Sequence, residues 1–151
     1  MINLKYIKSA SEDWAEKKPF PHLIIDDFFV TEVAKELENE FPSFDDELWH
    51  EYGNAIEVKK VCNNWNKFPK KTYRVFTYLN SQNFVDFLSE ALFGERKLSC
   101  DAGLNGGGWH MHSRGGKLNT HLDYSLHPKL GMQRKLNIIV YLNSEWQPDW
   151  G

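Results

Sequence analysis

The sequence predicts an α+β fold in which helices come first and antiparallel strands follow. Two segments within the first 94 residues repeat apolar positions with the period of a helix, whereas the residues after Gly94 carry the alternating β-branched and aromatic runs of strands. Helices and strands that are separated along the chain indicate helices that buttress one sheet. A length of 151 residues with 41% hydrophobic residues fits one domain with its own core.

The first predicted helix covers residues 32–41. Thr31 is a candidate N-cap, and Glu32 lies in the first turn, where a negative charge complements the helix dipole. Pro42 ends the helix because it cannot continue the backbone hydrogen bonds. The apolar face consists of Val33, Ala34, Leu37 and Phe41.

The second predicted helix covers residues 82–93. Ser81 is its candidate N-cap, and Gly94 supplies the stop at its end. Its apolar face consists of Phe84, Val85, Phe87, Leu88, Ala91 and Leu92. In both helices such a stripe indicates packing against a sheet and not a cofactor site.

Four segments after Gly94 have the pattern of strands. They are residues 98–104, 109–112, 117–124 and 134–142, of which the last is the strongest. Turns are expected between them at 105–108 and at 113–116, the second as a hairpin turn. Further upstream, residues 23–29 form an apolar run of strand length, and residues 43–72 give no confident element.

Charge and cysteine content narrow the class of protein. The net charge of −3 argues against a general nucleic-acid binder, and the lysine runs at 59–60 and 70–71 indicate solvated faces. No stretch approaches 18 apolar residues, so we expect no membrane span. Cys62 and Cys100 lie far apart, and the N-terminus lacks the apolar core of a signal peptide. We therefore expect a cytoplasmic protein without a disulfide framework.

His121 and Asp123 form the most informative motif of the chain. The surrounding Thr, Leu and Tyr residues favour a strand, which sends residues i and i+2 to the same face. An imidazole nitrogen and a carboxylate oxygen can then converge on one metal ion, as in the two-histidine, one-carboxylate site of non-heme Fe(II) oxygenases. The alternative for the motif alone is a strand with two polar residues facing solvent.

A series of short motifs follows in a fixed order from Gly106 to the last residue, with a lead-in upstream. They are Gly106-Gly107-Gly108-Trp109-His110, Arg114-Gly115-Gly116-Lys117-Leu118, His121-Leu122-Asp123-Tyr124, His127-Pro128, Arg134-Lys135-Leu136-Asn137, Tyr141-Leu142-Asn143, Trp146 and Trp150-Gly151, with Pro21-His22-Leu23-Ile24-Ile25-Asp26-Asp27-Phe28 and Glu40-Phe41-Pro42 before them. In order and spacing they resemble the 2-oxoglutarate/Fe(II)-dependent oxygenases, specifically the prolyl-4-hydroxylase-like branch.

The resemblance implies a double-stranded β-helix, or jelly-roll, with iron inside it. His121 and Asp123 match the first two iron ligands. Tyr141 matches a position whose hydroxyl contacts 2-oxoglutarate, with an ordinary strand aromatic as the alternative. His112 is a weaker candidate for facing the cosubstrate. Asn137 and Arg134 are further candidates for facing the pocket, with a loop or surface cation as the alternative for Arg134. The implied cofactors are Fe(II), 2-oxoglutarate and O₂, and ascorbate is a further candidate.

Two parts of the family pattern have no match in the sequence. The family places a distal histidine ligand and a basic residue for 2-oxoglutarate beyond the position of Gly151. His127 is the only histidine after Asp123, and a loop position beside Pro128 is a poor substitute. We therefore expect an N-terminal fragment of a longer oxygenase. Residues 1–151 would form one domain, with helical support over about 1–94 and the first barrel strands over about 95–151.

The function that the resemblance implies is hydroxylation of a C–H bond in a prolyl, amino-acid-like or other small-molecule substrate. The expected partner is this small molecule or a peptide, with neither nucleic acid nor membrane. One alternative is a non-catalytic jelly-roll binding module or an inactive fragment of an oxygenase. Another is a cupin-like metalloenzyme that uses no cosubstrate. The sequence contains no Gly-x-Ser-x-Gly elbow, phosphate-binding loop or His-Glu-x-x-His helix, which disfavours other enzyme classes.

Overall fold

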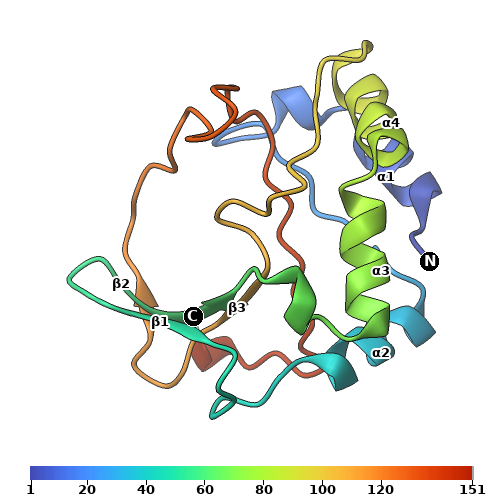
Figure 1. Cartoon of the computed structure of the whole chain (residues 1–151). Coiled ribbons are helices and arrows are strands. Elements are labelled where there is room, and N and C mark those ends of the chain that lie inside the picture. Colours follow the sequence, from blue (N-terminus) through green and yellow to red (C-terminus); the bar gives the residue numbers. More distant parts are fainter. Residues whose placement is uncertain (151) are drawn as a thin grey trace. The chain divides into compact units, whose positions relative to one another are not determined.

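Over the residues that the structure describes, the protein has an α+β fold with four α-helices and one small antiparallel sheet of four strands. The structure is a computed structural model, and it describes residues 1–150 (Figure 1). The chain divides into two compact units, which are built from interleaved segments. Residues 1–41, 70–100 and those from 141 onward form the helical unit, and residues 42–69 and 101–140 form the sheet unit.

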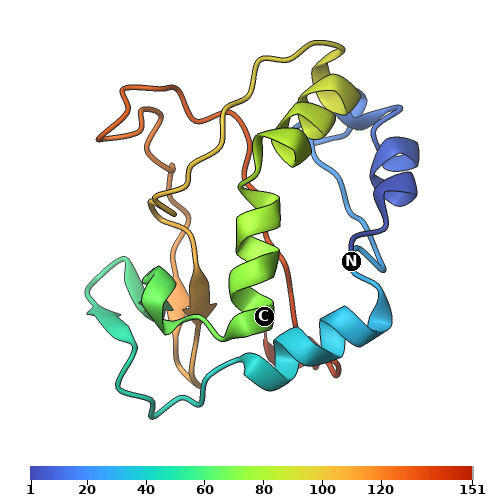
Figure 2. The same cartoon turned by 45° about the vertical axis from the view of Figure 1, so that its right-hand side comes forward.

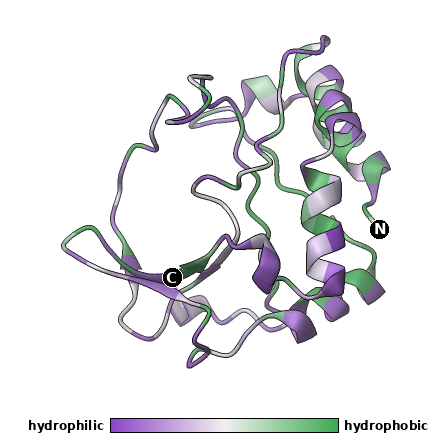
Figure 3. Ribbon diagram, in the orientation of Figure 1, coloured by the Kyte–Doolittle hydropathy of each residue, from purple (hydrophilic) through white to green (hydrophobic). Residues whose placement is uncertain are grey.

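The helical unit contains all four α-helices. They are α1 (Leu4–Ala10), α2 (Thr31–Glu40), α3 (Lys70–Leu79) and α4 (Gln82–Phe93), with short 3₁₀ turns at Trp14–Glu16 and Pro148–Trp150. Polar and apolar residues are both present along α3 and α4 (Figure 3), as expected of helices that bury one face. None of the helices in the described residues is long and apolar enough to cross a membrane.

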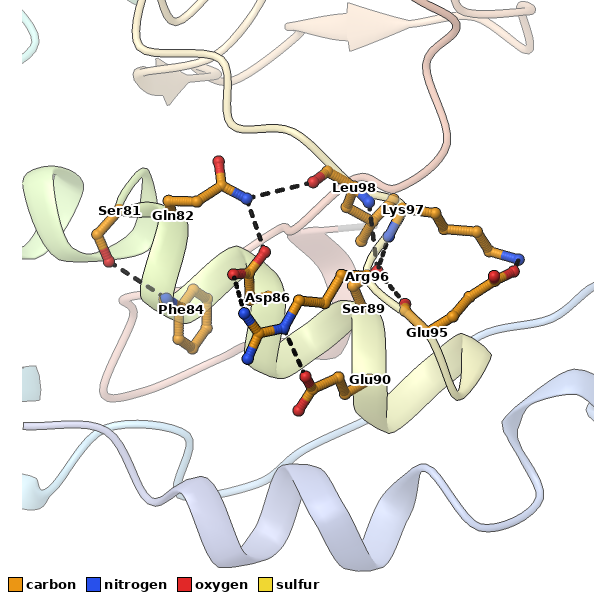
Figure 4. Close-up of polar contacts among 10 residues, drawn as sticks. All are labelled: Ser81, Gln82, Phe84, Asp86, Ser89, Glu90, Glu95, Arg96, Lys97 and Leu98. Atoms are coloured by element: carbon orange, nitrogen blue, oxygen red, sulfur yellow. Dashed lines mark hydrogen bonds and ion pairs between the residues drawn. The ribbon is translucent and has the colours of Figure 1, made fainter.

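Helix α4 confirms its prediction at both ends. The hydroxyl of Ser81 accepts a hydrogen bond from the backbone N–H of Phe84 at 3.3 Å, which satisfies one of the free donors of the first turn (Figure 4). Gly94 follows the last turn with a φ of 71°, a left-handed conformation that glycine adopts without a steric penalty. Helix α2 is confirmed with a small shift, since Thr31 is its first residue and Val30 occupies the N-cap.

The core of the helical unit forms where α2 packs against α3. Phe29, Val33, Leu37 and Val75 are buried there, and Leu142 from the last segment packs against them. The end of α2 lies beside the start of α3 (Figure 2), where the carboxylate of Glu40 accepts backbone hydrogen bonds from α3. Thus α2 contributes to α3 both apolar contacts and a cap for its first turn.

The sheet unit is centred on its second strand. The strands are β1 (His50–Gly53), β2 (Glu57–Cys62), β3 (Trp109–Met111) and β4 (Lys117–Leu118). β1 pairs with one edge of β2, and both β3 and β4 pair with its other edge, all antiparallel. The turn predicted at 113–116 is present, with a hydrogen bond from Gly116 N to Ser113 O, but it does not close a hairpin, because the strands on its two sides pair with β2 and not with each other.

The apolar centre of the sheet unit is aromatic. Trp109 and Cys62 are paired across β3 and β2, and both are buried. The ring of Phe68 contacts that of Trp109 edge to face at 5.0 Å, and Trp49 lies 6.4 Å from Trp109. Trp49 and Phe68 belong to residues 42–69 and Trp109 belongs to residues 101–140. These contacts therefore join the two chain segments of the sheet unit.

Several strand predictions are wrong. Residues 43–72 gave no confident element but contain β1, β2 and the start of α3, so strands begin well before residue 95. The predicted strands at 98–104 and 134–142 are absent from the described residues, and the one at 117–124 ends at Leu118. In the run 23–29 only Phe29 makes a bridge, to Ile2. A strand requires a hydrogen-bonded partner as well as a suitable composition, and these segments lack one.

Candidate functional site

His121 and Asp123 lie in the sheet unit, just after β4. Their side chains approach each other, with His121 Nε2 at 3.3 Å from Asp123 Oδ1. The two side chains are 38% and 48% exposed, so solvent reaches both groups. The convergence predicted from the i, i+2 spacing is therefore present, but an irregular segment produces it and not the alternation of a strand.

The other nitrogen of His121 fixes the tautomer of the ring. Nδ1 lies 2.7 Å from the carbonyl oxygen of Asn119, and a carbonyl only accepts, so Nδ1 donates. In the neutral ring Nε2 then carries a lone pair, which faces an oxygen of Asp123 that also only accepts. Two facing acceptors need a proton or a cation between them. A histidine that donates its remote N–H to a carbonyl is the usual arrangement of a metal ligand.

The distance between the two atoms fits one metal ion. Ligands at right angles on an octahedral ion, each about 2.1 Å away, lie about 3 Å apart. The observed 3.3 Å is close to this value. Imidazole nitrogen with carboxylate oxygen is also the donor set of non-heme iron. The residues present therefore fit two of the three protein ligands of such a centre.

Asn119 ties the site to the turn between β1 and β2. Its backbone N–H donates to Ile56 O at 2.9 Å, and its side-chain amide donates to Ala55 O at 3.2 Å. Asn54 shapes that turn, because its side-chain oxygen accepts from the N–H groups of Ile56 and Glu57. The carbonyl that orients His121 is therefore held by two hydrogen bonds to a structured turn.

Arg134 contacts the second oxygen of Asp123. Its Nη2 lies 3.4 Å from Asp123 Oδ2, and its guanidinium lies 5.1 Å from the centroid of the Tyr124 ring. The hydroxyl of Tyr124 donates to Asn105 O at 2.5 Å and accepts from the Asn105 amide at 2.7 Å. The two oxygens of Asp123 thus have different neighbours, an imidazole on one side and a cation on the other.

A row of polar side chains, which includes Glu57, Lys59 and His110, lies on one face of the sheet. Lys59 and His110 share this face, because Val61, two residues after Lys59, is paired with His110. Lys59 donates to Glu57 at 2.8 Å, and this hydrogen bond lowers the pKa of Glu57, to which the charge of His121 adds a smaller effect. His121 therefore lies close to this row.

His110 and His112, two residues apart and so on the same side of β3 and its continuation, favour the neutral form more than a free imidazole does. Burial lowers the pKa of His110, and the charge of Lys59 lowers it further, although backbone carbonyls of the preceding loop partly offset both effects. Burial and Lys59 also lower the pKa of His112, the weaker cosubstrate candidate. Each ring can therefore donate one hydrogen bond and accept another. The lysine run at 59–60, predicted to be solvated, is instead largely covered, since each side chain is 13% exposed.

The other two predicted residues, Tyr141 and Asn137, are both exposed. Tyr141 belongs to the helical unit, where its ring contacts Trp146 at 5.6 Å and remains 73% exposed. Asn137 lies exposed in the sheet unit. The sheet itself carries a hollow of about 220 Å³, lined by residues that include Phe44, Lys60 and Met111, and neither His121 nor Asp123 contributes to this lining.

His127 is occupied by its own loop. Its Nδ1 accepts hydrogen bonds from the N–H groups of Lys129 and Leu130, and its Nε2 lies 3.3 Å from Asp101 Oδ1. This agrees with the expectation that His127 is a poor third ligand. Within residues 1–150, no group of three His, Cys, Asp or Glu side chains is placed to hold a metal ion.

The sequence marked Arg134 only as a residue that could face the pocket, without its contact with Asp123, and it did not single out Asn119. A signal for Arg134 was present, because Pro128 and Gly131 between Asp123 and Arg134 are typical of a chain reversal. The structure has this reversal, with a bridge between Leu126 and Gln133.

Comparisons with protein-family models, curated proteins and solved structures found no match for this chain. The resemblance to oxygenases therefore stays a prediction from the sequence motifs.

Proposed function

We propose that this chain is a 2-oxoglutarate- and Fe(II)-dependent dioxygenase domain that hydroxylates a C–H bond of a prolyl, amino-acid-like or small-molecule substrate. The proposal includes a jelly-roll architecture and a cytoplasmic location. The observation that carries it is the approach of His121 Nε2 to Asp123 Oδ1 at 3.3 Å, with Nδ1 already bonded to Asn119. The sequence motifs from Gly106 onward supply the reaction class.

The protein groups have separate tasks in this proposal. His121 and Asp123 would hold the iron, and the Asn119 carbonyl fixes the tautomer of His121 that leaves the lone pair of Nε2 free for a metal. Iron bound together with 2-oxoglutarate supplies the activation of O₂. Tyr141, His112 and Asn137 remain the candidates for contacts with 2-oxoglutarate. Neutral imidazoles at 110 and 112 can donate hydrogen bonds to a polar cosubstrate or substrate at neutral pH.

The test is an anaerobic titration of the protein with Fe(II) and 2-oxoglutarate. We expect a weak visible charge-transfer band, which His121→Ala removes because the site loses one of its two ligands. His22→Ala is a matched control, since the His22 ring makes the same contact with the carbonyl two residues before it, Nδ1 to Phe20 O at 2.8 Å, but has Ile24 where His121 has Asp123. No band in the unsubstituted protein, or a band that survives in His121→Ala, contradicts the proposal.

A second candidate is a non-catalytic binding module with the same architecture. It is favoured by the lack of a three-residue metal group among the described residues. Release of succinate from 2-oxoglutarate under air separates the candidates, because an oxygenase produces succinate, whereas a binding module or a cupin-like metalloenzyme without a cosubstrate does not.

A further inference from the structure

We infer that Arg134 is a positioning residue that holds Asp123 as a one-oxygen metal ligand. The inference rests on the proposed function, since it concerns the same metal site. Arg134 Nη2 lies 3.4 Å from Asp123 Oδ2, while Oδ1 faces His121 Nε2 at 3.3 Å. A carboxylate can bind a metal through one oxygen or through both. With Oδ2 held by the guanidinium, Oδ1 is the oxygen that remains for the metal.

Arg134 is itself fixed in place. Its side chain is only 23% exposed, and its guanidinium lies over the ring of Tyr124 at 5.1 Å, within the range of a cation–π contact. Its backbone N–H donates to Ser125 O at 2.8 Å, which closes the chain reversal that brings it back to Asp123. A side chain restrained in this way can set the orientation of its partner, because it has little freedom left to lose.

The ring under Arg134 is held by the turn at residues 101–106. Tyr124 exchanges two hydrogen bonds with Asn105, and the N–H of Asn105 donates to Asp101 Oδ2 at 2.7 Å. Gly106 has a φ of 74°, and a Cβ there would come within 3.0 Å of the Tyr124 hydroxyl. Glycine therefore permits both the turn and the close approach of the tyrosine. A series of contacts thus runs from this turn through Tyr124 and Arg134 to Asp123.

Positioning and simple electrostatics predict opposite effects for the loss of Arg134. A guanidinium beside the site repels a divalent cation, so its removal would tighten binding if charge alone mattered. Its removal would weaken binding if its main effect is to orient Asp123. Loss of a group that orients a metal ligand typically costs about 10- to 100-fold in metal affinity.

The experiment measures the affinity of the full chain for Mn(II) alone, from the electron paramagnetic resonance signal of the free ion. We expect Arg134→Ala to weaken binding about 10- to 100-fold. Arg74→Ala is the matched control, because Arg74 is exposed on α3, in the other unit, and we expect no change. Ethylguanidinium at millimolar concentration should restore part of the affinity of Arg134→Ala, whereas sodium chloride should not. A loss of affinity through general damage to the fold would not respond to ethylguanidinium.

The outcomes distinguish the two proposals. Tighter or unchanged Mn(II) binding by Arg134→Ala overturns the role of Arg134 and leaves the metal site intact. Loss of affinity without rescue by ethylguanidinium also overturns it. No Mn(II) binding by the unsubstituted chain overturns the proposed function and, with it, the role of Arg134. If Arg134→Ala does not fold, Tyr124→Phe decides, since it keeps the ring but removes both bonds to Asn105. Weaker binding by Tyr124→Phe supports the inference, and unchanged binding overturns it.

Discussion

Ser89 holds together the turn that follows α4. Its side chain is completely buried; the hydroxyl donates to Glu95 O at 2.7 Å and accepts from the N–H groups of Lys97 and Leu98 at 2.8 and 3.2 Å (Figure 4). Ser89→Ala leaves three backbone groups without this partner, and an unsatisfied buried group costs about 1–3 kcal/mol. We expect the free energy of unfolding, measured by urea denaturation, to fall by about 2–4 kcal/mol.

Ser99 offers a control for this prediction, because it is exposed and close in sequence to the same turn. Ser99→Ala should change the free energy of unfolding by less than about 0.5 kcal/mol. An equally small change for Ser89→Ala would show that water replaces the hydroxyl at no cost.

For His121 and Asp123, the sequence predicted the right neighbours for a partly wrong reason. The i, i+2 spacing of His121 and Asp123 indicated convergence through a strand, yet the strand ends at Leu118. The convergence arises instead from Asn119, which anchors the segment to Ile56 and Ala55. Such an anchor joins residues 64 positions apart, and no local pattern reports it.

Helix α3 begins at a carboxylate supplied by another helix. Glu40, at the end of α2, accepts hydrogen bonds from Lys71 N, Thr72 N and the Thr72 hydroxyl, at 2.7–3.0 Å. Burial alone would raise the pKa of Glu40, but these hydrogen bonds outweigh it and bring the pKa below its usual value. Because the folded-state pKa is depressed, the stabilisation is present above the ordinary glutamate pKa of about 4.3 and is lost as the pH falls through the lower, folded-state value.

We expect Glu40→Gln to lower the free energy of unfolding at neutral pH by about 1–2 kcal/mol, since a neutral amide caps the helix less well. The difference between the two proteins should shrink as the pH is lowered below 4, about the range in which Glu40 becomes protonated. Urea denaturation at a series of pH values measures this. Glu47→Gln, a change of an exposed residue, should show neither effect, and a pH-independent difference for Glu40→Gln would contradict the assignment.

Helices were predicted more accurately than strands because their signals are local. Ser81 and Gly94 mark the ends of α4 within its own sequence, and both act as predicted. By contrast, β2 depends on partners up to 61 residues away, since Glu57 pairs with Leu118, and the apolar residues in its sequence, Glu-Val-Lys-Lys-Val-Cys, do not alternate regularly with polar ones. Residues 134–142 show the converse, since they have the composition of a strand but no strand partner in the described part of the chain.

That unpaired segment leaves apolar surface exposed in the molecule. Ile138, Ile139 and Val140 are 43%, 67% and 36% exposed, and none of residues 135–140 makes a backbone–backbone hydrogen bond within the described chain. An exposed β-branched run with free backbone groups is a template for association. We expect Ile139→Lys to slow aggregation, measured by light scattering at raised protein concentration, without lowering the free energy of unfolding.

Ile56→Lys provides the comparison for this prediction. Ile56 is 56% exposed, but its neighbours Ala55 and Glu57 do not extend an apolar run. An isolated exposed residue of this kind seldom drives association, so we expect the aggregation rate to stay unchanged. Equal slowing by both substitutions would indicate a general effect of added positive charge.

The anchoring of Asn119 to the β1–β2 turn limits how the pair of His121 and Asp123 can be transplanted. A synthetic peptide copying residues 115–124 would contain both His121 and Asp123 but not the carbonyls of Ala55 and Ile56 to which Asn119 bonds. In such a peptide the imidazole would rotate more freely, and ordering it would offset part of the free energy of the proposed metal binding. Engineering this pair into another scaffold would therefore require importing the distant turn as well.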